Sequence, residues 1–462
     1  MRVASLSLVL LLASCSAPPS PPQTSSSPAA SSTGAASSAP SAQPSGTPPG
    51  RIPQPDVQGL DLAPESARVD LAMPIFSDPT NITNPLFPIS DQASVLMLGT
   101  VEDLPFRSEV TLLPQTRIFE WSGQNVEARV SQYLAFLDGR IEEVAYDHYA
   151  QADDGSVWYF GEDVFNFAEG AIANTEGSWL AGRDGPAAMI MPSNPRVGDV
   201  YRPENIPGLV FEEVTVKEVD GTVEGPLGSV DGAMMVEELH ADGGNETKTF
   251  APGYGEFFTA AGGEVEALAL AVPTDASSEP MPRSLQALGD RATDAYEAAR
   301  TGDWQRTADS TAAARGSWNA YRAAPVPTRI ANRVRTSLRQ LTHAVRTRQS
   351  DAAAQAALNV LQSVLDLQLR YRDPQAVELD RIVLWTRQLE LNSAAARDAD
   401  VSGDAFTLDY LRDRLPADFG GELSERLTEQ FVEIQVAGSE GELRAAAEAA
   451  RDLRTTLARL GA

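Results

Sequence analysis

Between residues 80 and 272, hydrophobic and polar residues follow one another in short runs that are typical of β-strands. Residues 108–113, 126–130 and 214–219 are runs of this kind, and several of the runs alternate with period two. Turn signals separate them, namely the pairs Asp138-Gly139, Asp154-Gly155, Asp184-Gly185, Asp220-Gly221 and Asp231-Gly232. Many short strands joined by Asp-Gly turns predict an antiparallel β meander that curls into a sandwich or an open barrel.

The hydrophobic period changes to that of an α-helix at about residue 283. One stripe of apolar side chains at helical spacing contains Ile330, Val334, Leu338, Leu341 and Val345. Similar stripes recur at residues 358–369 and 443–460. The pattern predicts roughly seven helices in an up-down bundle, so that the chain as a whole has an α+β multidomain fold. A helical solenoid is the alternative, although the chain lacks a repeat signature at fixed spacing.

The charge of the chain changes at the same place as its hydrophobic period. Residues 51–280 contain 39 Asp and Glu against 11 Lys and Arg, whereas residues 281–462 contain 25 acidic residues, 24 Arg and no Lys. Such an acidic middle part repels nucleic acid and anionic lipid, so we expect no nucleic-acid partner. The excess negative charge either attracts cations and basic partners or keeps the domain soluble.

An apolar segment with a basic start opens the chain and ends at its only cysteine. Arg2 precedes the apolar residues 8–12, and Cys15 closes the run Leu12-Ala13-Ser14-Cys15. This arrangement resembles the signal peptide and lipobox of bacterial lipoproteins. The resemblance implies cleavage before Cys15, attachment of lipid such as palmitate to Cys15, and anchoring to membrane lipid on the extracytoplasmic side of the cell envelope. The alternatives are a plain signal peptide and a short transmembrane anchor, but spanning a bilayer needs about 20 apolar residues.

Residues 16–50 have no charged side chain and are mostly Ser, Pro, Ala, Gly and Thr. Such a segment buries too little apolar surface to fold, so we predict a disordered tether. The predicted divisions of the chain are a signal peptide at 1–14, a lipidated cysteine and tether at 15–50, an irregular lead-in at 51–79, an acidic β domain at 80–272, a linker at 273–282 and a helical domain at 283–462.

One hairpin of the middle part can be placed in register. If Asp154-Gly155 forms a two-residue turn, the strand pairs run outward from it. They are Gln151 with Trp158, Tyr149 with Phe160, and Asp147 with Glu162. Two facing carboxylates destabilise a sheet unless they are solvated at its rim, share a proton or bind a cation. The functional hypothesis is a small-cation or polar-ligand site, made by Asp147, Tyr149, Gln151 and Glu162 with Trp158 as a wall.

Seven short blocks stand out between residues 84 and 260. They are NPLFP at 84–88, DHYAQ at 147–151, VWYFGE at 157–162, TEGSW at 175–179, MP at 191–192, VGDVYR at 197–202 and APGYG at 251–255. In order and spacing these blocks resemble one recurring group of uncharacterised secreted bacterial proteins, many of them lipoproteins. The chain departs from the group at His148, where Trp is expected, and at Leu86, where an aromatic residue is expected. The resemblance implies a shared β fold and export, and it carries no activity.

Three functions are compatible with these features. The first, which we prefer, is a non-catalytic, lipid-anchored envelope protein that binds a ligand or an envelope protein partner. The second is a divalent-cation-binding protein, with Ca²⁺ as the ion that carboxylates suit best. The third is a hydrolase that uses Asp147 and Glu162 as its acid pair. No cofactor is predicted, and neither His148 nor His240 has a neighbouring histidine that would indicate a metal site.

Overall fold

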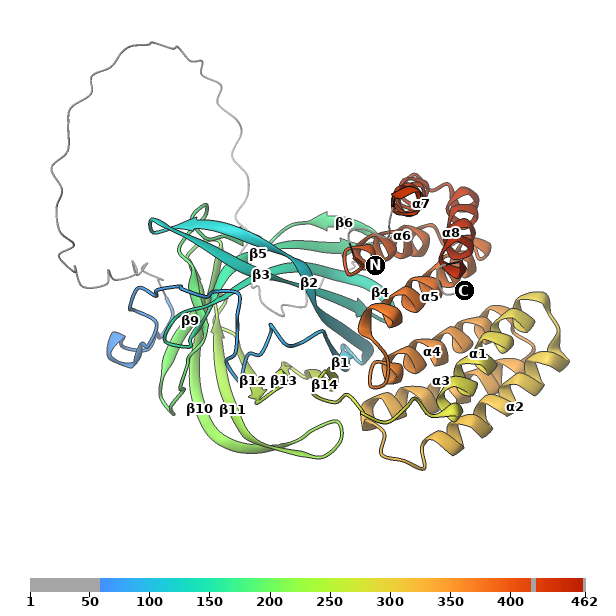
Figure 1. Ribbon diagram of the computed structural model, residues 1–462, viewed down its shortest axis with the longest axis horizontal. Coiled ribbons are helices and arrows are strands. Elements are labelled where there is room, and N and C mark those ends of the chain that lie inside the picture. Colours follow the sequence, from blue (N-terminus) through green and yellow to red (C-terminus); the bar gives the residue numbers. More distant parts are fainter. Residues whose placement is uncertain (1–58, 417–420, 460–462) are drawn as a thin grey trace, which may run out of the picture.

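The computed structural model describes residues 59–416 and 421–459 of the chain. The predicted signal peptide, the predicted lipidation site Cys15 and the predicted tether lie outside the described residues. Within them, fourteen strands form one antiparallel sheet, and eight α-helices follow the sheet along the chain (Figure 1). The mixed α+β class predicted from the change of hydrophobic period is therefore confirmed. None of the helices in these ranges has both the length and the apolar composition needed to span a membrane.

The first and last strands of the sheet meet in its middle. The strand order is β6-β5-β4-β3-β2-β1-β14-β13-β12-β11-β10-β9, and β7 and β8 each pair with β5. Because β8 also lies against β9, the two ends of this order approach each other and the sheet is curved. The strands are β1 (Ser94–Val101), β2 (Leu104–Trp121), β3 (Gln124–Leu137), β4 (Arg140–Gln151), β5 (Val157–Ala168), β6 (Ala171–Asn174), β7 (Trp179–Leu180), β8 (Ala188–Met191), β9 (Val200–Ile206), β10 (Val210–Glu224), β11 (Ser229–His240), β12 (Asn245–Ala251), β13 (Gly255–Ala261) and β14 (Glu264–Val272).

Residues with positive φ mark the places where the strands turn or bulge. Asp138 and Gly139 have φ values of 49° and 79°, and they join β3 to β4 by a tight turn, as predicted. Asp220-Gly221 and Asp231-Gly232 instead lie inside β10 and β11, where the pairing register shifts. The prediction of turns at these two pairs is wrong, because a β-bulge needs the same positive φ as a hairpin turn.

The helices gather on one side of the molecule (Figure 1). Helix α1 packs against α2 and α4, and α3 packs against α4, while α5 and α7 each pack against α6 and α8. Helix α6 contacts β4 and β6, and helix α3 contacts β14, so these two helices pack against the sheet. The helices are α1 (Arg283–Thr301), α2 (Trp304–Tyr321), α3 (Thr328–Thr347), α4 (Ser350–Gln368), α5 (Pro374–Ala394), α6 (Asp398–Arg412), α7 (Gly421–Ser439) and α8 (Leu443–Ala458).

The sheet and the helices share one hydrophobic cluster. Phe136 of β3 stacks on Trp385 of α5 with ring centroids 5.2 Å apart, and Phe167 of β5 packs edge-on against Phe406 of α6. Each part thus buries apolar side chains of the other, which stabilises the contact by roughly 25 cal/mol for each Å² removed from water. The face of the sheet that turns away from the helices is left to form the polar interior described below.

A buried network of charged side chains crosses the same interface. Arg381 of α5 and Arg414, which follows α6, both contact Glu109 of β2, and Arg414 donates a hydrogen bond to it at 2.6 Å. Arg107 of β2 donates two hydrogen bonds to Asp366 of α4, at 2.7 and 2.8 Å. Burial alone raises the pKa of Glu109, but the three arginines outweigh it and hold that pKa well below its usual range.

Candidate functional site

The hairpin of β4 and β5 positions the two acids that the sequence singled out. Asp147 lies directly opposite Glu162, as predicted. Tyr149, however, pairs with Tyr159, and Gln151 pairs with Val157, so the other two predicted pairs are wrong. The connection between the strands is longer than a two-residue turn, which shifts the register by one residue. A bulge between Asp147 and Tyr149 shifts it back.

Gly161 makes the bulged part of β5 possible. Its φ is +101°, and a Cβ atom there would lie 2.1 Å from the carbonyl oxygen of Trp179 on β7. Only glycine therefore fits where β7 pairs with β5. The close approach places Trp179 edge-on against Tyr159, with ring centroids 5.4 Å apart.

A cavity of about 100 Å³ lies on the inner face of the curved sheet. Asp147, Tyr149 and Glu162 line it, so the structure brings these three predicted site residues together. Strands β5 and β13 both contribute to its wall although five strands separate them in the sheet order, which is a direct result of the curvature. We call this space the inner cavity.

The other two predicted site residues lie away from the inner cavity. The side-chain oxygen of Gln151 accepts hydrogen bonds from the backbone N–H groups of Thr83 and Asn84, at 2.8 and 2.9 Å. Trp158 packs near Trp121 and donates its indole N–H to the hydroxyl of Ser156 at 2.9 Å. Both side chains thus hold neighbouring segments in place rather than lining the cavity wall.

Five carboxyl groups face the inner cavity. They belong to Glu143, Asp147, Glu162, Glu256 and Glu266. Among the described residues that line the cavity there is no Lys, Arg or His. Burial raises the pKa of Asp147 to about 7, and burial together with the charge of Asp147 raises that of Glu143 to about 8. Burial also raises the pKa of Glu162 and of Glu266 well above the usual range. The wall therefore has a strong excess of acid groups, and the ammonium of Lys248, which lies outside the lining, offsets only part of the charge of Glu256 and Glu266.

Aromatic rings complete the wall of the inner cavity, namely those of Phe87, Tyr133, Tyr149 and Tyr254. Phe87 meets Tyr149 edge-on with centroids 4.8 Å apart, and Tyr149 stacks on Tyr159 at 5.0 Å. The hydroxyl of Tyr159 donates a hydrogen bond to Oδ1 of Asp147 at 2.7 Å. Acids and aromatic faces together make an environment that attracts cations.

The segment of residues 84–92 covers one side of the inner cavity. Asn84 fixes it by donating hydrogen bonds to the carbonyl groups of Gly155 and Pro192, at 3.1 and 3.0 Å. The carbonyl of Pro85 accepts from the N–H of Gly253 at 2.8 Å. These contacts join three of the seven sequence blocks noted above, namely NPLFP, MP and APGYG, so those blocks meet at one place in the fold.

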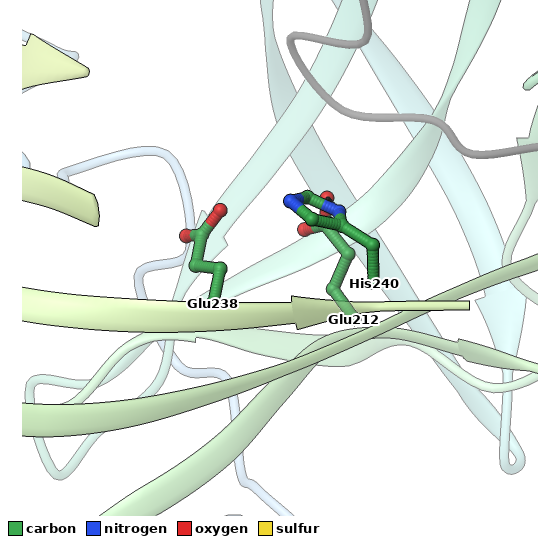
Figure 2. A group of neighbouring side chains, drawn as sticks. All are labelled: Glu212, Glu238 and His240. Carbon is green, nitrogen blue, oxygen red and sulfur yellow. Dashed lines mark ion pairs between the residues drawn. The ribbon is translucent and has the colours of Figure 1, made fainter. Parts of the chain in front are cut away.

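A second polar group lies on the inner face and consists of Glu212 on β10 with Glu238 and His240 on β11 (Figure 2). One ligand atom from each residue lies within 4.8 Å of the others. Nδ1 of His240 is 3.3 Å from Glu212, and its Nε2 is 3.5 Å from Glu246 on β12. Lys248 is 2.7 Å from Glu238. We call Glu212, Glu238 and His240 the Glu-Glu-His group.

Glu204 of β9 connects the two polar regions. It lies opposite Glu212 in the register of β9 and β10, and its Oε1 accepts a hydrogen bond from Trp179 at 2.9 Å. Its other acidic neighbour is Glu162, and the charge of Glu204 contributes to the raised pKa of Glu162. Burial, followed by the charge of Glu212, raises the pKa of Glu204 well above its usual range. The inner face is therefore acidic along its length, from the cavity to the Glu-Glu-His group.

Sequence reasoning missed the Glu-Glu-His group, although a weak signal for it exists. Glu238 and His240 are two residues apart on β11, so their side chains share a face. Glu212 lies opposite His240, and Glu246 lies opposite Glu238, which only the strand register reveals. His148 lies elsewhere, with Nδ1 2.9 Å from the carbonyl of Gly161, and burial lowers its pKa to about 4.

Comparison with known proteins adds no relative to this description. No protein-family model matches the chain, and no curated protein matches its sequence. The functional argument therefore rests on the geometry and chemistry of the inner face alone.

Proposed function

We propose that this protein is a non-catalytic binding protein of the bacterial cell envelope that takes a small organic cation, such as an aliphatic amine, into its inner cavity. The observation that carries the proposal is the composition of the cavity wall, which has five carboxyl groups, four aromatic rings and no basic side chain among its described residues. A buried carboxylate is stabilised by a nearby positive charge, and aromatic faces attract organic cations.

The volume of the inner cavity limits the size of this ligand. A cavity needs only about 10–15 Å³ by this measure to hold one water molecule, so the inner cavity, at about 100 Å³, has room for several waters or for a small organic cation. A ligand of about five non-hydrogen atoms contributes at best about −1.5 kcal/mol for each of them, which corresponds to a Kd on the order of a few μM or weaker. Such an affinity suits reversible uptake or sensing better than permanent storage.

The proposed location rests on the lipobox at Leu12 to Cys15 and on the uncharged tether that follows it. In this proposal the helices form an up-down bundle that supports the sheet, and the tether holds the folded part at a distance from the membrane. Labelling cells with palmitate tests the anchor. The wild-type chain should incorporate the label and a Cys15→Ser chain should not, and label that persists in Cys15→Ser would contradict the anchor.

Calorimetric titration tests the ligand class. Methylammonium, trimethylammonium and ethylenediammonium are titrated into the purified protein at pH 8, with a neutral alcohol of similar size as a parallel probe. We expect saturable binding of at least one amine and none of the alcohol. Glu162→Gln and Asp147→Asn should weaken binding about tenfold or more, because each removes a carboxyl group whose ionised form a bound cation would stabilise.

The control for these variants is Glu120→Gln, which removes an acid from the exposed end of β2 and should leave the affinity unchanged. The proposal is wrong if none of the amines binds saturably, or if binding survives in both cavity variants. The hydrolase alternative has less support, because burial raises the pKa of both Asp147 and Glu162, whereas an acid pair needs one ionised member at working pH.

A further inference from the structure

We infer that the Glu-Glu-His group binds a divalent transition-metal ion, with Zn²⁺ as the representative ion, at a site separate from the inner cavity. Its three ligands come from neighbouring strands, so their backbone positions are fixed by the sheet rather than by a loop. Figure 2 shows Glu212, Glu238 and His240 extending to the same side of β10 and β11. This site is independent of the amine proposal.

Buried polar atoms without hydrogen-bond partners indicate a cation site at this place. Glu212 is 1% exposed, yet neither of its carboxylate oxygens has a hydrogen-bond partner, and the same holds for Nδ1 of His240. The nearest contact between them is the 3.3 Å approach of that nitrogen to Oε1 of Glu212. Buried polar atoms are almost always hydrogen-bonded, so a carboxylate and an imidazole nitrogen that lie at ion-pair distance without a hydrogen bond between them are two candidate ligands.

The second nitrogen of His240 has the environment typical of a metal ligand. Nε2 is 3.5 Å from the carboxylate of Glu246, which lies on β12. A metal-binding histidine usually directs its other nitrogen to a carboxylate, which fixes the ring orientation and makes the ligating nitrogen more basic. Glu246 therefore acts as a positioning residue, and Nδ1 remains directed at Glu212.

The donor set selects the class of metal. Two carboxylates and one imidazole suit Zn²⁺, Mn²⁺ or Fe²⁺, whereas Ca²⁺ takes oxygen ligands alone. The Ca²⁺ expectation from the sequence therefore does not fit this group. Ligand atoms around Zn²⁺ lie about 2.0–2.2 Å from the ion. Ligand atoms at that distance from one ion lie about 3.4 Å apart in a tetrahedral arrangement. The three ligands, now within 4.8 Å of one another, would therefore have to move closer together when the ion binds.

Lys248 provides a charge that competes with the metal. Its ammonium is 2.7 Å from Glu238 and 3.7 Å from Glu246. Binding of a metal ion to Glu238 must share or displace this contact, so Lys248 should weaken metal binding. Lys248→Gln should therefore tighten Zn²⁺ binding, whereas removal of a side chain with a purely structural role has no such effect.

The test is a titration of the purified, metal-free protein with Zn²⁺ alone, followed by calorimetry. We expect one Zn²⁺ per chain. Glu212→Gln and His240→Gln should weaken binding by about tenfold or more, and Lys248→Gln should strengthen it. The matched control is Glu218→Gln, an exposed glutamate on the same strand as Glu212, which should bind as the wild type does. The absence of saturable binding, or equal binding by wild type and Glu212→Gln, would overturn the inference.

Nuclear magnetic resonance of the wild-type histidines avoids the risk that a variant fails to fold. The chain has three histidines, so their imidazole ¹⁵N signals are few enough to assign. Zn²⁺ should shift the signals of His240 and leave those of His148 and His343 in place. A shift of another histidine, or of none, counts against the site. Amine binding should change far less in Glu212→Gln than in Glu162→Gln, because Glu212 does not line the inner cavity, so the two proposals can fail separately.

Discussion

The hydroxyl of Tyr159 donates a 2.7 Å hydrogen bond to Asp147 across the β4–β5 pair, and both side chains are buried. This contact supplies a proton donor to an acid that has no basic side chain beside it in the inner cavity. It also fixes the ring of Tyr159 between Tyr149 and Trp179. One hydroxyl therefore orients both an acid and an aromatic face of the proposed ligand site.

Tyr159→Phe should destabilise the protein, because it leaves a buried carboxyl oxygen without its donor. We expect a loss of about 1–3 kcal/mol in the free energy of unfolding, measured by urea denaturation. Tyr149→Phe is the matched control, since it removes a hydroxyl from the next ring of the same stack. Equal losses in the two variants would show that the Tyr159–Asp147 hydrogen bond adds nothing to stability beyond the effect of removing any tyrosine hydroxyl from this stack.

The buried acids make the stability of the protein depend on pH. The folded-state pKa is about 7 for Asp147 and about 8 for Glu143, both above the values of 3.8 and 4.5 for the free groups. Below about pH 4 these carboxyls are protonated in the folded and unfolded chains alike. Their contribution to the free energy of unfolding is then at its most favourable. As the pH rises from about 4 to 8, only the folded chain holds the protons, so the free energy of unfolding falls.

We therefore expect stability to decrease between pH 5 and pH 8 by about 3 kcal/mol or more. Thermal unfolding at several pH values measures it. Asp147→Asn removes one titrating group, so its stability should change less with pH than that of the wild type, and parallel curves would contradict the assignment. The groups that face Asp147 are Glu143, Tyr149, Tyr159, Glu162, Glu256 and Glu266. None of these is basic, so no nearby cation offsets the effect.

The charged network at the interface should couple the sheet to the helices. Arg414→Met leaves Glu109 with fewer cations in a buried place, and we expect a loss of about 3 kcal/mol in the free energy of unfolding. Arg444→Met is the control, because Arg444 is 92% exposed in its pair with Glu448 and should matter by less than about 0.5 kcal/mol. Urea denaturation, followed separately by helix and tryptophan signals, measures both variants.

The close approach at Gly161 allows a test of how tightly β7 is held against β5. Gly161→Ala places a methyl group 2.1 Å from the carbonyl oxygen of Trp179, at a positive φ. Gly123→Ala has a positive φ as well, but nothing lies within 4 Å of its new methyl group. Gly123→Ala should lower the free energy of unfolding by about 1–2 kcal/mol through backbone strain alone. Gly161→Ala should lower it by clearly more, because the steric clash adds to the strain. Similar melting temperatures for the two would mean that β7 moves away at little cost.

Local patterns were enough to predict some parts of this structure. The change from period two to period 3.6 near residue 283 locates the change from strands to helices, because β14 ends at Val272 and α1 begins at Arg283. The pairing of Asp147 with Glu162 followed from a hairpin, in which partners are close in sequence. It was correct only because a bulge compensates the longer connection, which the sequence does not indicate.

Features that depend on long-range pairing were beyond prediction. The inner cavity needs β5 and β13 on facing parts of one sheet, and its acids Glu162 and Glu266 are more than a hundred residues apart in the chain. The Glu-Glu-His group depends on the register of β10 against β11, and three register shifts between Val216 and Thr222 alter it. A one-residue change in register moves a side chain to the other face of the sheet. Counting residues outward from a turn therefore does not predict which side chains face each other here.

The pairing of β1 with β14 also has a consequence for how the chain assembles. Ser94 of β1 pairs with Val272 at the end of β14. The two strands can therefore pair only when nearly the whole strand region is present. Each half of the sheet is a meander of strands that follow one another in the chain. The β1–β14 pair instead joins distant parts of the chain, and such contacts slow folding. Synthesis or export that stops before Val272 leaves β1 without its second neighbour. The open edge of β1 would then be free to pair with other chains, so truncation in this part of the chain should cause aggregation.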